Sequence, residues 1–339
     1  NEALDLIKGG NWPNAANIDP ASFVDALFQT HVYDGGSAQN IVNGIDLSNK
    51  GGLIWTKSRS HALDHGLFDS ENSNFGSYLS SNNQAASSSL SGHVTANTNG
   101  FSLDSTGYGP TNANNVEYVS WTFRKQPKFF DIVTYTGTSV GGTTVNHNLG
   151  SVPGMIIVKN ISHGSSNWRV YHRGVDVANN DPEDYVLILN DTNSRGDSDS
   201  YWNDTAPTST QFTLGGDDDV NDFGDSYVAY LFAHNNNDGG FGPDGDQDII
   251  KCGSYTGNGN STGPTIDLGF EPQWILQKSG TKSNTDWAIA DFMRGFTADG
   301  VYQRLRPNRD SAEGSETQLA PTSTGFKVVG TAGDVNENG

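Results

Sequence analysis

The sequence predicts an all-β protein built from tandem β-sandwich domains of the jelly-roll or lectin-like kind. Three observations indicate this fold class. One pattern of residues occurs three times along the 339-residue chain. The apolar segments are short and rich in β-branched and aromatic residues, which favour strands. The chain contains 41 Gly, together with many Asn and Ser between the apolar segments, and these residues are typical of turns.

Each copy of the pattern opens on a Tyr and runs to an apolar segment that ends in Lys. The separation between the Tyr and the Lys is 24, 24 and 23 residues in the three copies, and such agreement is improbable by chance. The residues are Tyr33 and Lys57, Tyr135 and Lys159, and Tyr255 and Lys278. An internal repeat of this kind decides the architecture of the chain.

The match continues after the Lys. Trp168 and Trp287 each follow their Lys by 9 residues, whereas the first copy has His65 near this place and matches more loosely. A Phe follows in every copy, at Phe101, Phe212 and Phe326. A closing strand then reads YVSWTF at 118–123 and YVAYLF at 227–232. In the third copy this strand would fall after residue 339, so we expect that copy to be incomplete or to be completed elsewhere.

The expected domains follow from these positions. Residues 1–31 form an N-terminal connector with a short helix in DPASFVDALF, where Asp19 is the N-cap and Pro20 the first helical residue. The three β-sandwich repeats span 32–128, 129–248 and 249–339. The second includes a Gly- and Asp-rich linker at 233–248, and the third is incomplete. Repeats of this length predict a row of separately folded units.

The apolar patterns predict strands that are covered on both faces. Three consecutive apolar residues precede the end of every Lys-terminated segment, as in Met155–Ile157. In YVAYLF, Val228 and Tyr230 alternate with Ala229 and Leu231, so both faces are apolar. Such strands belong between two packed layers.

Composition excludes several classes of function. The formal net charge of −20 argues against nucleic-acid binding, which needs clustered Lys and Arg. No run of 18 apolar residues occurs, so membrane insertion is not expected. Cys252 is the only cysteine, which excludes an internal disulfide and favours a buried, inert thiol.

Two Asp clusters are candidate calcium sites, because carboxylates are preferred ligands of this cation. The candidate ligands are Asp217, Asp219, Asp222, Asp244, Asp246 and Asp248. The second cluster is not an EF-hand, since Ile249 and Tyr255 stand where Gly and Glu are required. Solvated acidic loops are the alternative. The His pair in HALDH (61–65) lacks the Glu of a zinc protease motif, and a loop is the favoured interpretation.

The sequence predicts no catalytic residues. No nucleophile elbow and no phosphate-binding Gly-rich loop is found, although pairs of acids able to hydrolyse glycosides stay open as an alternative. Tyr201 and Trp202 have no counterpart in the other repeats. We therefore predict an exposed ligand contact at these two residues.

The repeat resembles the tandem modules of tail-fibre and other virion structural proteins of marine phages, such as cyanophages and pelagiphages. The resemblance lies in the spaced pattern YTG, LG, P, I..K, W, RG, GF and YVAYLF. The resemblance covers residues 32–339. It implies a non-enzymatic virion protein, most simply a homotrimeric tail fibre or adhesin that binds other virion proteins and a host-surface glycan or receptor. Two alternatives stay open: a capsid-decoration or head-fibre protein, and a secreted polysaccharide-binding or hydrolysing lectin-like protein.

Overall fold

The computed structural model describes residues 23–176 and 178–338. Most of the predicted connector therefore lies outside the described residues. Where the predicted helix is described, it is wrong: Val24–Ala26 form a single 3-10 turn (η3), and strand β1 (Phe28–Asp34) begins immediately afterwards. Phe28 pairs with Phe123 in this strand. Sheet pairing and burial override the local helix signal here.

The first repeat folds into antiparallel sheets, as the strand patterns predicted. One sheet has the order β1-β9-β3-β4, and the other has the order β2-β8-β7. A short pair, β5-β6, lies beside them. The strands are β2 (Gln39–Val42), β3 (Gly52–Ser58), β4 (Gly66–Asp69), β5 (Ser77–Tyr78), β6 (Ser88–Ser89), β7 (Val94–Asn97), β8 (Gly100–Leu103) and β9 (Glu117–Arg124).

The second repeat has the same arrangement with additions. Its main sheet has the order β10-β17-β12-β13-β14-β15, and β11 pairs with β16. The elements are β10 (Phe130–Thr136), β11 (Thr143–Asn146), β12 (Pro153–Asn160), β13 (Arg169–His172), η4 (Pro182–Asp184), β14 (Tyr185–Ile188), β15 (Gly196–Asp197), α2 (Asp199–Trp202), β16 (Gln211–Leu214), α3 (Asp218–Asn221) and β17 (Ser226–Ala233).

The third repeat has counterparts of most of these strands. β19 pairs with β20, β18-β24-β23 form a sheet, and β21 pairs with β22. The elements are β18 (Thr265–Asp267), β19 (Trp274–Gln277), β20 (Ala288–Asp291), η5 (Phe292–Arg294), β21 (Val301–Arg304), β22 (Gly314–Thr317), β23 (Leu319–Thr322), β24 (Gly325–Val328) and α4 (Gly333–Asn336). Within the described part of this repeat, no strand takes the place of β9 or β17.

The matched residues occupy matched places. The Tyr that opens each copy donates its hydroxyl hydrogen to a backbone carbonyl near the end of the same copy. The three acceptors are the carbonyls of Thr111, Val220 and Val335. The residue after each acceptor is Asn112, Asn221 or Asn336, and each of these buried side chains donates to two or more loop carbonyls. The sequence repeat is therefore a structural repeat.

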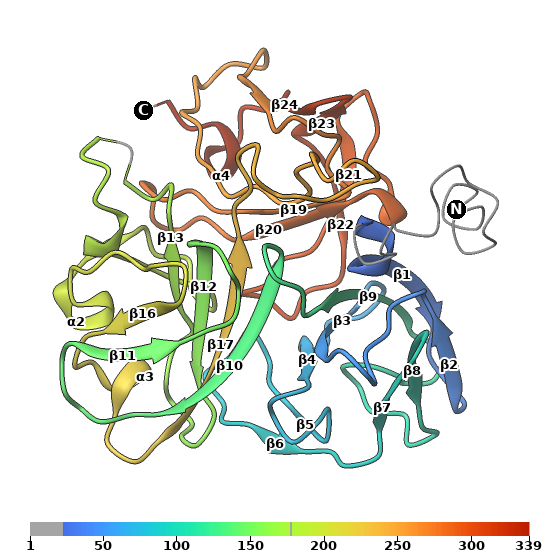
Figure 1. Ribbon diagram of the computed structural model, residues 1–339. Coiled ribbons are helices and arrows are strands. Elements are labelled where there is room, and N and C mark those ends of the chain that lie inside the picture. Colours follow the sequence, from blue (N-terminus) through green and yellow to red (C-terminus); the bar gives the residue numbers. More distant parts are fainter. Residues whose placement is uncertain (1–22, 177, 339) are drawn as a thin grey trace.

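The repeats are joined by one core, which corrects the expectation of separately folded units. Each repeat does have a core of its own. A further cluster contains buried residues of all three repeats, among them Trp55, Trp121, Trp168, Tyr230 and Trp287. Figure 1 shows the three repeats as three lobes around this centre, in blue to cyan, green to yellow, and orange to red.

The two-faced strands explain how one chain builds four cores. In β17, Val228 and Tyr230 belong to the shared core, whereas Ala229 and Leu231 belong to the core of the second repeat. The prediction of cover on both faces is confirmed. Because one face of each central strand needs the other repeats as cover, the shared core holds the three lobes together.

The predicted linker at 233–248 is a packed loop. Phe241 is buried in the shared core, and Asn235 is buried as well. The side chain of Asn235 accepts the backbone N–H of Ile249 and of Ile250. A segment with these contacts is fixed to the fold despite its Gly- and Asp-rich composition.

Candidate functional site

One side chain at the same place in every repeat reaches into a neighbouring repeat. Trp168 precedes β13, and its indole Nε1 donates to the carbonyl of Ser80 (3.0 Å) in the first repeat. Trp287 precedes β20, and its Nε1 donates to the carbonyl of Ile188 (2.8 Å) in the second repeat. These contacts join the third repeat to the second and the second to the first.

His65 provides the third contact between repeats, which joins the first repeat to the third. It precedes β4, and its Nε2 lies 3.0 Å from the carbonyl oxygen of Arg306 in the third repeat. Its Nδ1 accepts the indole N–H of Trp55 (2.9 Å), so the neutral ring carries its hydrogen on Nε2 and donates to Arg306. Burial lowers the pKa of His65 well below its usual value. His65 therefore donates the hydrogen bond between repeats that a Trp donates in the other two copies.

The repeat lysines also serve structure. Lys57 donates to the carbonyl of Asp310 in the third repeat, and Lys159 donates to the carbonyl of Gln84 in the first. Lys278 donates to Thr285 within its own repeat. Burial lowers the pKa of all three ammonium groups to about 8. Hydrogen bonds to carbonyl oxygens are what such buried ammonium groups require.

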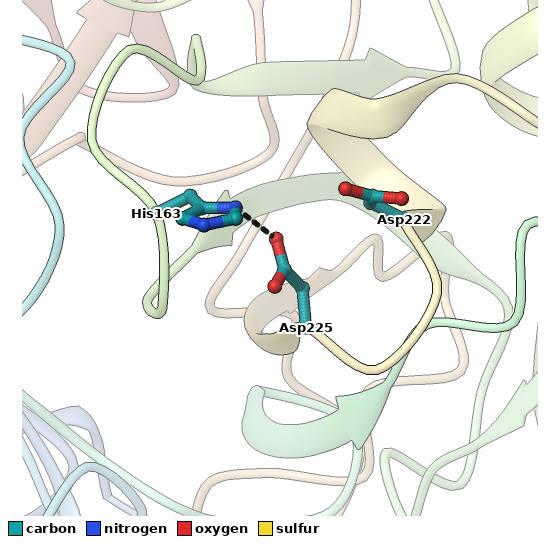
Figure 2. Close-up of side chains that lie close together, drawn as sticks. All are labelled: His163, Asp222 and Asp225. Carbon is teal, nitrogen blue, oxygen red and sulfur yellow. Dashed lines mark ion pairs between the residues drawn. The ribbon is translucent and has the colours of Figure 1, made fainter.

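An acidic hollow of about 620 Å³ lies on the second repeat, at the end of β12 and around α3. His163, Asp222 and Asp225 offer ligand atoms that all lie within 4.8 Å of one another (Figure 2). Nδ1 of His163 lies 2.9 Å from a carboxylate oxygen of Asp225, which also accepts a hydrogen bond from Asn160. Two carboxylates and an imidazole could hold a divalent cation, while the ion pair already accounts for two of the three groups.

The predicted ligands of the first Asp cluster line this hollow, but they do not converge on one position. Asp217 caps the start of α3 by accepting the backbone N–H of Asp219. Asp219 forms an ion pair with Arg169, at 2.7 Å, and accepts the backbone N–H of Asn167. Asp222 alone among the predicted ligands belongs to the group in Figure 2. His163 and Asp225 were missed because their approach depends on how two loops fold.

The second Asp cluster is not gathered either. Asp244 and Asp246 are exposed, whereas Asp248 is half-buried and accepts the backbone N–H groups of Asn237 and Gly239. Asp248 also pairs with Lys251 at 3.4 Å. Across the described residues, His163, Asp222 and Asp225 form the only group of three metal-ligating side chains close enough to share an ion.

The predicted aromatic contact is wrong for Trp202. This side chain is 2% exposed, packs against Tyr171 and donates its indole N–H to the carbonyl of Tyr185. Tyr201 is half-buried beneath the guanidinium of Arg169, 4.3 Å from the ring centre. The absence of a counterpart in other repeats reflects the extra helix α2, whose apolar face completes a core.

Two exposed apolar side chains beside the acidic hollow were missed by sequence reasoning. Phe223 is 79% exposed and Val140 is 62% exposed, and the loops that carry them are joined by a hydrogen bond from the N–H of Phe223 to the hydroxyl of Ser139. Phe223 directly follows Asp222 of the acidic hollow. The ring of Phe223 is therefore available to a ligand at the edge of the acidic hollow.

Comparison with known proteins gives a family. A family model described as "Domain of unknown function (DUF7483)" matches residues 24–339. The chain belongs to this family. The match spans all three repeats, as expected if the shared core makes them one structural unit.

No curated protein and no solved structure matches the chain. Among the residues that the structure describes, no helix is both long and apolar enough to cross a membrane.

Proposed function

We propose that this member of the DUF7483 family is a non-enzymatic structural protein of a phage particle, in particular a tail-fibre component that contacts a host-surface glycan. The spaced repeat pattern that resembles marine phage virion modules supports the assignment to a particle. The exposed ring of Phe223 beside the acidic hollow supports the glycan contact, and it is the observation that carries the proposal.

The chemistry of this surface suits a sugar. An aromatic ring stacks on the apolar face of a pyranose, and carboxylates beside it accept hydrogen bonds from hydroxyl groups. Phe223 provides the ring, and Asp217, Asp218 and Asp222 surround the hollow next to it. The corresponding loop of the first repeat, at 105–117, has one acid, Glu117. The second repeat therefore carries the contact.

The scaffold supports a mechanical role. Three repeats that share a core and are joined at corresponding side chains hold their outer loops in fixed relative positions. A fibre protein needs this property, because weak contacts add up only when the loops that make them stay at a set spacing. Its localisation is then the virion, and its partners are further copies of itself, as a homotrimer, and other virion proteins.

The glycan contact is tested by binding to an array of bacterial surface polysaccharides. We expect Phe223→Ala to weaken binding by roughly tenfold or more, as for a central aromatic contact residue. Met293→Ala is the matched control, since Met293 is a 56% exposed apolar side chain on the third repeat. Equal binding by the wild type and the Phe223→Ala protein would contradict the proposed contact.

Two further measurements separate the alternatives. Native mass spectrometry showing a stable trimer supports the fibre, whereas a monomer whose melting temperature rises with added glycan supports the secreted lectin-like protein. Imaging of labelled particles separates a tail fibre from a capsid decoration. Depolymerisation of a polysaccharide that is lost on a single Asp→Asn substitution would overturn the non-enzymatic assignment.

A further inference from the structure

The third repeat has an open sheet edge. β3 lies between β9 and β4, and β12 lies between β17 and β13. β19, their counterpart, pairs with β20 on one side, and on its other side lies a cavity of about 800 Å³. Residues 249–257, which correspond to β1 and β10, line the same cavity. The cavity therefore occupies the place that β9 and β17 fill in the other repeats.

The walls of this cavity suit an apolar strand. Ile250, Trp274 and Leu276 line it and pack only partly against the shared core, whereas the whole of β3 and β12 is buried. Two buried polar atoms on β19, Nε1 of Trp274 and Oε1 of Gln277, have no hydrogen-bond partner among the residues that the structure describes. Open backbone groups, apolar walls and unpartnered polar atoms are what a sheet shows when a strand is missing.

Tyr255 indicates the second residue of the missing strand, which corresponds to Tyr118 of β9 and Tyr227 of β17. In the first repeat, Tyr33 stacks on Tyr118 of β9 with ring centres 5.4 Å apart. In the second, Tyr135 stacks on Tyr227 of β17 at 5.0 Å. Tyr255 corresponds to Tyr33 and Tyr135, and it lines the cavity. A Tyr on the incoming strand would complete this pair.

The backbone around α4 is arranged for the same Tyr. The hydroxyl of Tyr227 accepts the N–H of Asp222 and donates to the carbonyl of Asp218, which lie just after and before Asn221. Tyr118 makes the matching bonds around Asn112. At Asn336 the corresponding groups are the N–H of Glu337 and the carbonyl of Gly333, both beside the cavity.

His172 indicates the fifth residue of the strand, which corresponds to Trp121 of β9 and Tyr230 of β17. The indole N–H of Trp121 in β9 donates to Asp291, the last residue of β20 (3.0 Å), and the hydroxyl of Tyr230 in β17 donates to Asp69, the last residue of β4 (2.8 Å). His172 is the last residue of β13, completes this series and lines the cavity.

The hydrogen-bonding state of His172 selects a Tyr. Its Nδ1 accepts the N–H of Gly174, so in the neutral ring the hydrogen lies on Nε2. This N–H needs an acceptor. A Tyr hydroxyl can accept it, whereas a Trp indole can only donate. The strand should therefore resemble β17, which has Tyr230 at this place, rather than β9, which has Trp121.

We propose that the open edge of β19 and its cavity bind an extended peptide segment of the pattern Tyr-Val-x-Tyr-x-Phe, antiparallel to β19. Its first Tyr stacks on Tyr255, its second Tyr accepts from His172, and its Phe packs beside Trp274. β9 and β17 each begin five residues after the buried Asn of the preceding loop. The corresponding Asn of the third repeat is Asn336 in α4, so the segment enters from the side of α4. Binding is by addition of a strand to a sheet.

The test uses the full chain and a synthetic peptide with the sequence of β17, Ser226–Ala233, flanked by Lys for solubility. We expect the peptide to raise the melting temperature in a concentration-dependent way. A control peptide of the same composition, with its two faces exchanged by a one-residue shift of the pattern, should bind at least roughly tenfold more weakly. Equal binding of the two peptides would refute a specific strand site.

The contact with His172 is tested by a double-mutant cycle. Replacing the second Tyr of the peptide with Phe should weaken binding to the wild type by about tenfold, the loss expected for one hydrogen bond. The same replacement should have little effect on the His172→Leu protein. An equal loss in both proteins would refute the assigned register.

A fusion protects the test against aggregation of the peptide. The β17 sequence is joined after Gly339 through one residue, which reproduces the spacing between Asn221 and β17. We expect the fusion to raise the melting temperature, and the shifted sequence not to. If neither the peptide nor the fusion changes the melting temperature, the cavity does not take a strand and the inference is wrong.

Discussion

Replacing Trp168 with Phe tests whether the three repeats form one cooperative unit. Trp168 is fully buried, and its indole N–H donates to the carbonyls of Ser80 and Asn83 in the first repeat. The substitution removes this donor from the carbonyl of buried Ser80 and from the carbonyl of half-buried Asn83, at a cost of about 1–3 kcal/mol. The smaller ring adds about 1–2 kcal/mol for lost packing. We therefore expect a loss of about 2–5 kcal/mol in the free energy of unfolding.

The assay combines urea denaturation with hydrogen exchange resolved along the chain. If the shared core couples the repeats, the wild type unfolds in one transition, and Trp168→Phe speeds exchange of the slowest amides in all three repeats. Trp202→Phe is the comparison variant, because Trp202 is equally buried but donates within its own repeat. Its loss of stability should come mainly from local opening around α2.

Two results would refute this reasoning. One is a loss below about 1 kcal/mol for Trp168→Phe, which would mean that the contact between repeats contributes little. The other is faster exchange confined to the second repeat, with separate unfolding transitions for the others. That outcome would restore the picture of a row of independent domains.

Three substitutions and one titration test the remaining features. Asn221→Ala removes the side chain that donates to two loop carbonyls. Because several hydrogen bonds are lost together, urea denaturation should show a decrease of about 2–4 kcal/mol in the free energy of unfolding. Burial raises the pKa of Asp69 to about 6, so its contribution to stability is complete below pH 4 and is lost as the pH rises through 6. A pH series of melting temperatures should show this slope in Asp244→Asn, an exposed control, but not in Asp69→Asn. Lys159→Met should lower the free energy of unfolding by about 1–3 kcal/mol, because it removes the hydrogen bonds to the carbonyls of Gln84 and Ser166. Unchanged stability would mean that this contact between the first and second repeats contributes little. Calcium binding by the Asp clusters stays a prediction, and a chelator titration that leaves the melting temperature unchanged would count against it.

The sequence alone determined the strands and much of their burial. Alternation in YVAYLF predicted two apolar faces, and both are buried, because the period of side chains along a strand follows from the backbone. The recurrence of Tyr, Lys and Phe at set spacings identified the repeat. The Tyr and Phe residues make these contacts within their own repeat, so their matched roles follow from the repeated pattern. Lys57 and Lys159 instead reach a neighbouring repeat, which the pattern did not indicate.

Tertiary structure decided what covers each face and which side chains meet. Nothing in the spacing of His65 indicates that its ring reaches Arg306, 241 residues away, or that it replaces a Trp. Trp202 looked like an isolated surface aromatic, yet it fills a core that α2 helps to close. The acids of 217–225 have different partners: Asp217 caps α3, Asp219 pairs with Arg169, and Asp225 pairs with His163. Periodicity reports which face of a strand is apolar, but only the packing of distant segments determines what lies against it.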